Sequence, residues 1–116
     1  MKVLGYRFCM TLDEHAPMLD FFDKLGLKRK ELPPEITDEF PGAIYPAGES
    51  WVEIWQAGEQ MPAGTMLQIF VDDVHAFVTE GRANGLEMSD PSEMHGEMVS
   101  FTTAPNGMFV SVQSPN

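Results

Sequence analysis

The sequence predicts an α+β domain built from two modules with the same order of elements, a strand, a helix and three strands (βαβββ). Three observations lead to this prediction. Segments with apolar residues at alternate positions are interspersed with segments of helical spacing. The order of these segments repeats, with module one at about residues 1–57 and module two at about residues 65–116. A polar linker that contains Gly and Pro, residues 58–64, separates the two modules.

The first module begins with a strand and a helix. Residues 2–11 are rich in β-branched and aromatic side chains, which is typical of a strand. Asp13 is a candidate N-cap for the helix that follows, and Gly26 fits the position just after its last turn. Three apolar residues form the predicted buried stripe of this helix: Leu19, Phe22 and Leu25.

The rest of the first module is predicted to be extended. Residues 27–31 indicate a short strand, and the run 32–34 (LPP) opens a loop. Residues 43–46 and 50–56 are expected to form a hairpin around the turn at 47–49.

The second module repeats this plan. Residues 65–71 predict a strand, and Asp73 is a candidate N-cap for the next helix. The predicted buried residues of that helix are Val74, Phe77 and Val78. Residues 86–88 are expected to be short and extended, and 97–102 are expected to pair with 107–113 through a turn.

Two pairs of segments support an internal duplication. Gly26-Leu27 and Gly85-Leu86 stand at the predicted ends of the two helices. Residues 51–54 (WVEI) and 109–112 (FVSV) occupy the same place in the last strand of each module. Because one such module is too small to enclose a good core, two are expected to pack together.

Composition narrows the class of protein. The 116 residues are 43% hydrophobic and 22% charged, which is typical of a globular domain. Cys9 is the single cysteine, so no intramolecular disulfide is expected, and the beginning of the chain does not resemble a signal peptide. With no run of about 18 apolar residues, we expect a cytoplasmic protein rather than a membrane protein.

Charge narrows the class of partner. The net charge is −11 with seven basic residues, so nucleic acid and anionic membranes are not expected as partners. The acidic field favours a cationic small molecule, although an acidic surface also serves solubility alone.

Three motifs in the right order resemble those of the vicinal-oxygen-chelate superfamily, which includes glyoxalase I, bleomycin-resistance proteins and extradiol dioxygenases. They are the helix end at 21–27 (FFDKLGL), the strand-to-helix junction at 70–74 (FVDDV) and the turn and last strand at 104–110 (APNGMFV). The resemblance covers essentially the whole chain. It implies that the sheet of each module curls and that the two sheets enclose a cleft, commonly in a homodimer.

Strand alternation divides each strand into a core face and a cleft face. Val52 and Ile54, Val110 and Val112, and Leu67, Ile69 and Val71 are expected in the core. The opposite parity, together with Arg7 in the first strand, gives the predicted ligand-binding residues: Arg7, Trp51, Glu53, Trp55, Gln68, Phe70, Phe109 and Ser111.

The resemblance also implies four metal-ligand positions, and these fall on Arg7, Glu53, Met66 and Ser111. Only Glu53 is a suitable ligand, because a guanidinium has no free lone pair and a thioether prefers soft ions. A catalytic divalent ion needs about three protein ligands. We therefore expect no metal cofactor, while a set such as Glu53, Gln68 and Gln113 stays open.

Other catalytic groups are sparse. His15 and His75 lie at the expected helix starts and His95 in a loop, with no spacing typical of a metal site. Cys9 and Ser111 share the cleft face with no histidine to activate them.

Two functions remain from the sequence. The first is a metal-free, bleomycin-resistance-like protein, of the antibiotic-resistance kind, that sequesters an aromatic, cationic ligand at or near a homodimer interface. The alternative is a metal-dependent glyoxalase-like lyase or isomerase, or a dioxygenase, that uses Glu53. The aromatic residues either contact ligand or fill the space between the sheets, and Arg7 could pair with Glu53.

Overall fold

The computed structural model describes residues 1–116, which form two compact units. Residues 8–65 make the N-terminal unit. Residues 1–7 together with 66–116 make the C-terminal unit. The first strand, β1 (Val3–Leu12), contributes its beginning to the C-terminal unit and its end to the N-terminal unit.

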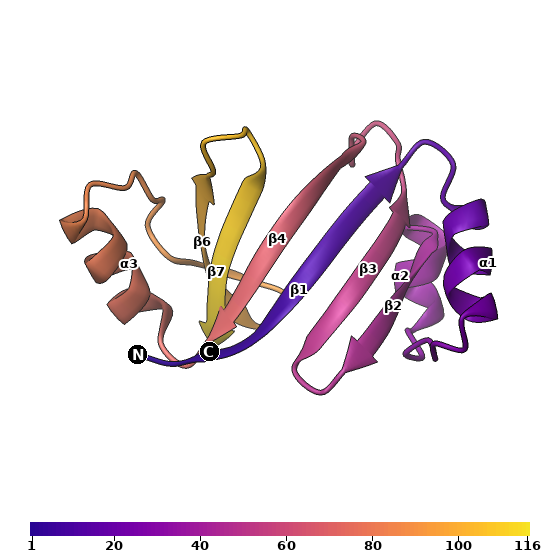
Figure 1. Ribbon diagram of the computed structural model, residues 1–116, viewed down its shortest axis with the longest axis horizontal. Helices are drawn as coiled ribbons and strands as arrows, with labels where there is room; N and C mark the ends of the chain where they lie inside the picture. Colours follow the sequence, from indigo (N-terminus) through magenta and orange to yellow (C-terminus); the bar gives the residue numbers. More distant parts are fainter. The chain divides into compact units, whose positions relative to one another are not determined.

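The N-terminal unit combines part of a sheet with two helices (Figure 1). Its strands are arranged in the order β2–β3–β1, and β2 and β3 form an antiparallel hairpin in which Ala47 lies opposite Ser50. After β1, its elements are α1 (Ala16–Lys24), α2 (Pro34–Glu39), β2 (Gly42–Ala47) and β3 (Ser50–Gln56). The hairpin predicted from the sequence is therefore confirmed.

The core of this unit lies between α1 and the β2–β3 hairpin. Its buried members are Leu19, Ala43, Tyr45 and Ile54. Val52 and Phe22 pack against this cluster, so the predicted core face of β3 is confirmed. The Tyr45 hydroxyl is 3.2 Å from the carbonyl oxygen of Leu19, which ties the hairpin to the helix.

Three details of the first helix region differ from the prediction. The helix begins at Ala16 with His15 as its N-cap, and Asp13 does not cap it. Pro17 in the first turn favours this later start, because its fixed φ suits the first helical positions. Leu25 is 61% exposed and lies outside the core. Gly26, at φ 95°, ends the helix as predicted.

Residues 27–31 are not a strand, contrary to the prediction. The segment carries four consecutive charged residues, and the Arg29 guanidinium pairs with Asp23 on α1. Its link to β2 is the 2.8 Å bond from the Lys30 N–H to the carbonyl oxygen of Ile44. The expected loop at 32–34 leads into α2, which has a proline in its first turn.

The C-terminal unit has the complete βαβββ order (Figure 1). Together with the beginning of β1 it contains β4 (Gly64–Val71, of which residues 64 and 65 belong to the other unit), α3 (Val74–Ala83), β5 (Ser92–Met94), β6 (Glu97–Thr103) and β7 (Phe109–Pro115). The strand order is β1–β4–β7–β6–β5, with β4 parallel to β7 and β6 antiparallel to it. The α+β class is confirmed.

The core of the C-terminal unit lies beneath α3. Val71, Val74, Val78 and Val112 are its buried members, as the sequence pattern predicted. Asp73 caps α3 as predicted, because its carboxylate accepts from the N–H groups of His75 and Ala76.

Residues 86–88 do not form a strand. They run beside β6, where the Thr102 hydroxyl donates to the carbonyl oxygen of Glu87 at 2.7 Å. The additional strand is instead β5, which pairs with the beginning of β6. None of the helices has the length and apolar character needed to cross a membrane.

Candidate functional site

Strand register gathers several predicted residues on one face of the C-terminal unit. In the parallel β4–β7 pair, Gln68 lies opposite Ser111 and Phe70 lies opposite Gln113. Residues paired directly across neighbouring strands share a face of the sheet. Because Arg7 from β1 lies over the Phe70 ring, with its Cζ 4.1 Å from the ring centroid, it shares this face as well.

A polar network occupies this face. The Arg7 guanidinium donates to both carboxylate oxygens of Glu97, at 3.1 and 3.2 Å. The Gln113 side-chain amide donates to the same carboxylate at 2.9 Å, and the Ser111 hydroxyl donates to the Gln113 amide oxygen at 2.7 Å. Arg7 is 4% exposed and Ser111 is 0% exposed. We call these four residues the Arg7–Glu97 network.

The chemistry of this network is that of a structural tie. A buried charge is costly unless it is paired and hydrogen-bonded, and the positive charge of Arg7 lies against the negative charge of Glu97. The network joins β1, β6 and β7, which are far apart in the sequence. It therefore contributes to holding these strands in register.

A different arrangement lies on β3 in the N-terminal unit. The Trp51 indole N–H donates to one oxygen of the Glu53 carboxylate at 2.7 Å. The Trp55 indole N–H donates to the other oxygen at 2.9 Å. Trp51 and Glu53 are half-buried, whereas Trp55 is 7% exposed. We call these three residues the tryptophan face.

A glycine makes room for the second indole. Gly42 lies opposite Trp55 in the β2–β3 hairpin. A Cβ atom added at Gly42 would overlap the Trp55 ring and the carbonyl oxygen of Ile54. The close packing of Trp55 therefore depends on the absence of a side chain at position 42.

Lys30 and Cys9 lie close to the tryptophan face and interact with it electrostatically. The Lys30 ammonium lies 5.5 Å from the centroid of the Trp51 ring, within the range of a cation–π contact. Burial, reinforced by the negative charge of Glu53, raises the pKa of the Cys9 thiol to about 12. The Cys9 side chain is therefore a neutral thiol at physiological pH and is not an activated nucleophile.

The donor groups do not fit a divalent metal at the four positions implied by the sequence resemblance. Both oxygens of Glu53 already accept indole N–H groups, and Arg7 is engaged with Glu97. Ser111 donates its hydroxyl proton to Gln113, and Met66 offers a thioether. No cluster of three or more His, Cys, Asp or Glu side chains is placed to hold a metal ion.

The three histidines lie where the sequence predicted them, and they are not grouped as metal ligands would be. His15 is at the start of α1, where its Nδ1 is 2.7 Å from the side-chain oxygen of Gln56. His75 is in the first turn of α3, and His95 is in the tight turn between β5 and β6, with φ 51°.

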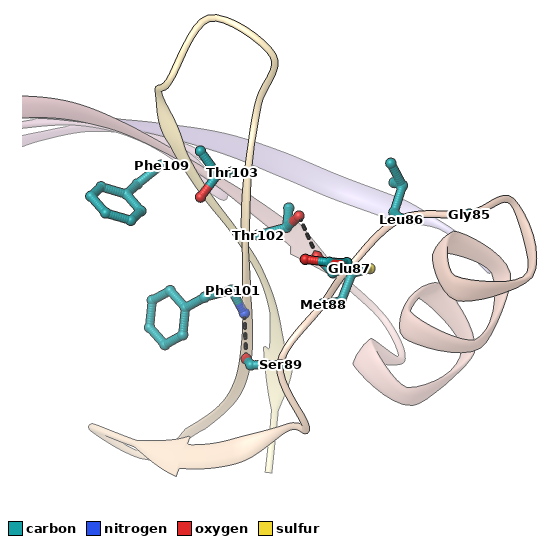
Figure 2. A pocket seen from close by; sticks show the side chains of 9 residues that line it. All are labelled: Gly85, Leu86, Glu87, Met88, Ser89, Phe101, Thr102, Thr103 and Phe109. Carbon is teal, nitrogen blue, oxygen red and sulfur yellow. Dashed lines mark hydrogen bonds between the residues drawn. The ribbon is translucent and has the colours of Figure 1, made fainter.

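A hollow of about 400 Å³ opens along the edge of the C-terminal unit (Figure 2). It lies between residues 85–89 and 101–103, with Phe109 at its rim. Figure 2 shows the rings of Phe101 and Phe109 projecting from the same side of the β6–β7 hairpin. Phe109 is 62% exposed, and it is the only predicted site residue that lines this hollow.

The predicted site residues thus divide between the two units. Arg7, Phe70 and Ser111 lie in or against the Arg7–Glu97 network, with Gln68 beside Ser111. Trp51, Glu53 and Trp55 form the tryptophan face. Their roles in ligand binding stay predictions, as do the cleft and the homodimer.

Sequence reasoning missed two residues. Glu97 has the same parity as Val99, which lies opposite Gln113, so alternation along β6 could have placed it on the Arg7 face. Lys30 left no such signal, because its segment is neither helix nor strand.

Comparison with known proteins gives the fold. No protein-family profile and no curated protein matches the sequence. Among solved structures, an NAD-dependent benzaldehyde dehydrogenase from Legionella pneumophila superposes with a TM-score of 0.67 at 13% identity, covering 96% of this chain and 99% of that chain.

Two further structures agree. A glyoxalase/bleomycin resistance protein/dioxygenase superfamily member from Vibrio splendidus gives a TM-score of 0.65 at 16% identity, covering 94% of this chain and 97% of that one. The methylmalonyl-CoA epimerase from Mycobacterium tuberculosis gives 0.63 at 12% identity, with 98% and 87% covered. At such low identity these similarities establish a shared fold, and function has to be argued from the site.

Proposed function

We propose that this chain, which has the glyoxalase/bleomycin resistance protein/dioxygenase fold, is a small-molecule binding protein. It would work without a metal and sequester an aromatic, cationic ligand on the tryptophan face. The observation that carries this proposal is the pair of indole N–H groups that donate to the single carboxylate of Glu53. Such a protein would protect its cell from the ligand by mass action, because bound ligand is withdrawn from solution. No covalent bond of the ligand would change.

The tryptophan face suits such a ligand for two reasons. Both indoles donate to Glu53 from their edges, and the half-buried Trp51 contributes a ring whose electron-rich surface attracts cations and stacks with flat molecules. The indole N–H groups are neutral, so they orient the carboxylate without cancelling its charge. The net charge of −11 adds a long-range attraction for cations.

The same contacts support binding without a metal. A metal ion at Glu53 would have to compete with two indole donors for the carboxylate oxygens. The remaining positions offer a guanidinium already paired with Glu97, a hydroxyl and a thioether, which together make a poor ligand set for a hard or borderline cation.

The test is a calorimetric titration with two probes of similar shape, the cationic N-methylquinolinium and the neutral quinoline. We expect the wild type to bind the cationic probe more tightly. Glu53→Gln should weaken binding of the cationic probe by roughly 1–3 kcal/mol, the scale of a charge-assisted contact, and should change the affinity for quinoline little. Trp51→Ala should weaken the binding of both probes, because it removes a ring face.

The matched control is Phe21→Ala, which removes an exposed aromatic ring from α1 in the same unit. It should leave both affinities unchanged. Equal affinities of wild type and Trp51→Ala for N-methylquinolinium would refute the proposal. So would a stoichiometric divalent metal that the wild type retains after desalting and that Glu53→Gln loses, because that result would point to metal-dependent lyase or dioxygenase chemistry.

A further inference from the structure

We infer that Lys30 is a built-in competitor for the cation position on the Trp51 ring and thereby sets the charge selectivity of the tryptophan face. This inference rests on the proposed function, since it describes how that same face discriminates between ligands. The Lys30 ammonium lies 5.5 Å from the Trp51 ring centroid. It is therefore a cation of this chain in a place that a cationic ligand would use.

The backbone holds Lys30 beside the tryptophan face. Its N–H donates to the carbonyl oxygen of Ile44 at 2.8 Å. Ile44 lies directly opposite Glu53 in the β2–β3 hairpin. The main chain at Lys30 is thus fixed next to the hairpin, although the segment around it forms no regular secondary structure.

The side chain of Lys30 is free to leave. It is exposed, and an ammonium on four methylene groups samples many rotamers. A cation–π contact at an exposed site is worth about 0.5–1 kcal/mol, which is small enough for a ligand to displace. Lys30 therefore covers the ring reversibly.

The charge of the ligand decides how costly this displacement is. A neutral aromatic ligand stacked on Trp51 offers the Lys30 ammonium a new electron-rich face, so the ammonium can stay close. A cationic aromatic ligand repels the ammonium, which then has to move into solvent. Lys30 should accordingly weaken the binding of cationic ligands and leave that of neutral ligands nearly unchanged.

The first experiment needs no ligand binding to be informative. In the free protein, the ε-methylene protons of Lys30 should show an upfield NMR shift from the ring current of Trp51. The shift should disappear in Trp51→Ala, and it should also disappear in the wild type at saturating N-methylquinolinium. An unshifted Lys30 signal in the free wild type would overturn the inference without touching the proposed function.

The second experiment compares affinities for the two probes. Lys30→Gln should bind N-methylquinolinium about two- to fivefold more tightly than wild type, with no gain for quinoline. Lys30→Arg keeps the positive charge and should behave like wild type. Lys28→Gln, the matched control, removes the same charge two residues earlier on the same segment and corrects for the overall change in net charge.

The outcomes separate the two claims. An equal gain in affinity in Lys28→Gln would assign the effect to net charge and overturn the inference. An equal gain for quinoline would show that Lys30 acts as a steric cover, which also overturns it. Binding of N-methylquinolinium that depends on Trp51 but not on Lys30 would sink the inference and leave the proposed function intact. Binding that does not depend on Trp51 would remove both.

Discussion

Glu53 in β3 and Ser111 in β7 occupy the same place in the internal repeat, in the last strand of each unit. The two polar residues differ in burial and in their hydrogen-bond partners. Glu53 is half-buried, and its contacts are two neutral indole donors. Ser111 is fully buried and is the end of a chain of hydrogen bonds that leads through Gln113 to the ion pair of Glu97 and Arg7.

The difference indicates that charge balance, more than residue type, separates the proposed binding surface from a structural contact. In the Arg7–Glu97 network one positive and one negative charge meet, and the amide and hydroxyl complete their hydrogen bonds. In the tryptophan face the carboxylate is oriented by groups without charge. The first arrangement is complete in itself, and the second retains an attraction for a cation.

The largest expected effect comes from removing one charge of the network. Glu97→Ala should lower the free energy of unfolding by about 3 kcal/mol, because it leaves a buried guanidinium without its carboxylate. Urea denaturation measures this loss. The double variant Arg7→Met/Glu97→Leu should be more stable than Glu97→Ala, because no buried charge is left over.

Glu53→Gln is the matched substitution on the other unit. It should lower the free energy of unfolding by about 1–2 kcal/mol, less than Glu97→Ala, because the amide oxygen still accepts one indole N–H while the amide NH2 faces the other. An equal loss of free energy of unfolding in Glu97→Ala and Glu53→Gln would contradict the distinction between a charge-balanced network and a carboxylate without a charged partner.

A smaller effect is expected when the support of the tryptophan face is altered. Gly42→Ala should lower the free energy of unfolding by about 1–3 kcal/mol, because the new Cβ forces the Trp55 ring to move. Binding of N-methylquinolinium should weaken although Trp51 and Glu53 are unchanged. Gly64→Ala is the control, since its Cβ would enter open space. A Gly42→Ala variant that binds and unfolds like Gly64→Ala would show that Trp55 is not held in place by this packing.

The fold could be predicted from the sequence because its strong signals are local. Alternation placed Ile54 and Val112 in the two cores, and Asp73 and Gly85 marked the ends of α3 correctly. The failures occurred where local signals competed. Asp13 was a good N-cap candidate, but Pro17 shifted the start of α1.

The candidate site was harder to predict, since it depends on pairing between distant strands. Parity along β3 was enough to place Trp51, Glu53 and Trp55 together. The partner of Arg7 lies 90 residues away, and the register that brings Glu97 to it is fixed only in the folded sheet. The proximity of Lys30 to Trp51 was likewise hidden from the sequence, because the segment of Lys30 forms no regular element and meets β2 through a backbone hydrogen bond to Ile44.

The smallest effect concerns the thiol next to the tryptophan face. Burial and then the charge of Glu53 raise the pKa of Cys9 from 9.0 to about 12. The folded state therefore holds the thiol proton more tightly than the unfolded state. The contribution of this proton to the free energy of unfolding is fully present below pH 9 and is lost as the pH rises from 9 toward 12. At pH 9.5 the loss should be about 0.8 kcal/mol relative to Cys9→Ala, measured by urea denaturation at pH 8 and 9.5.

The reactivity of the same thiol tests whether Glu53 keeps its negative charge. Glu53→Gln removes one of the two causes that raise the Cys9 pKa and should speed alkylation of Cys9 by iodoacetamide at fixed pH, because the thiolate fraction increases. Glu49→Gln, which removes an exposed carboxylate from the β2–β3 turn, should leave the rate unchanged. An unchanged rate in Glu53→Gln would mean that the carboxylate charge is already compensated in the folded protein. The charge of the tryptophan face would then be balanced like that of the Arg7–Glu97 network, and the physical basis for binding a cation there would be gone.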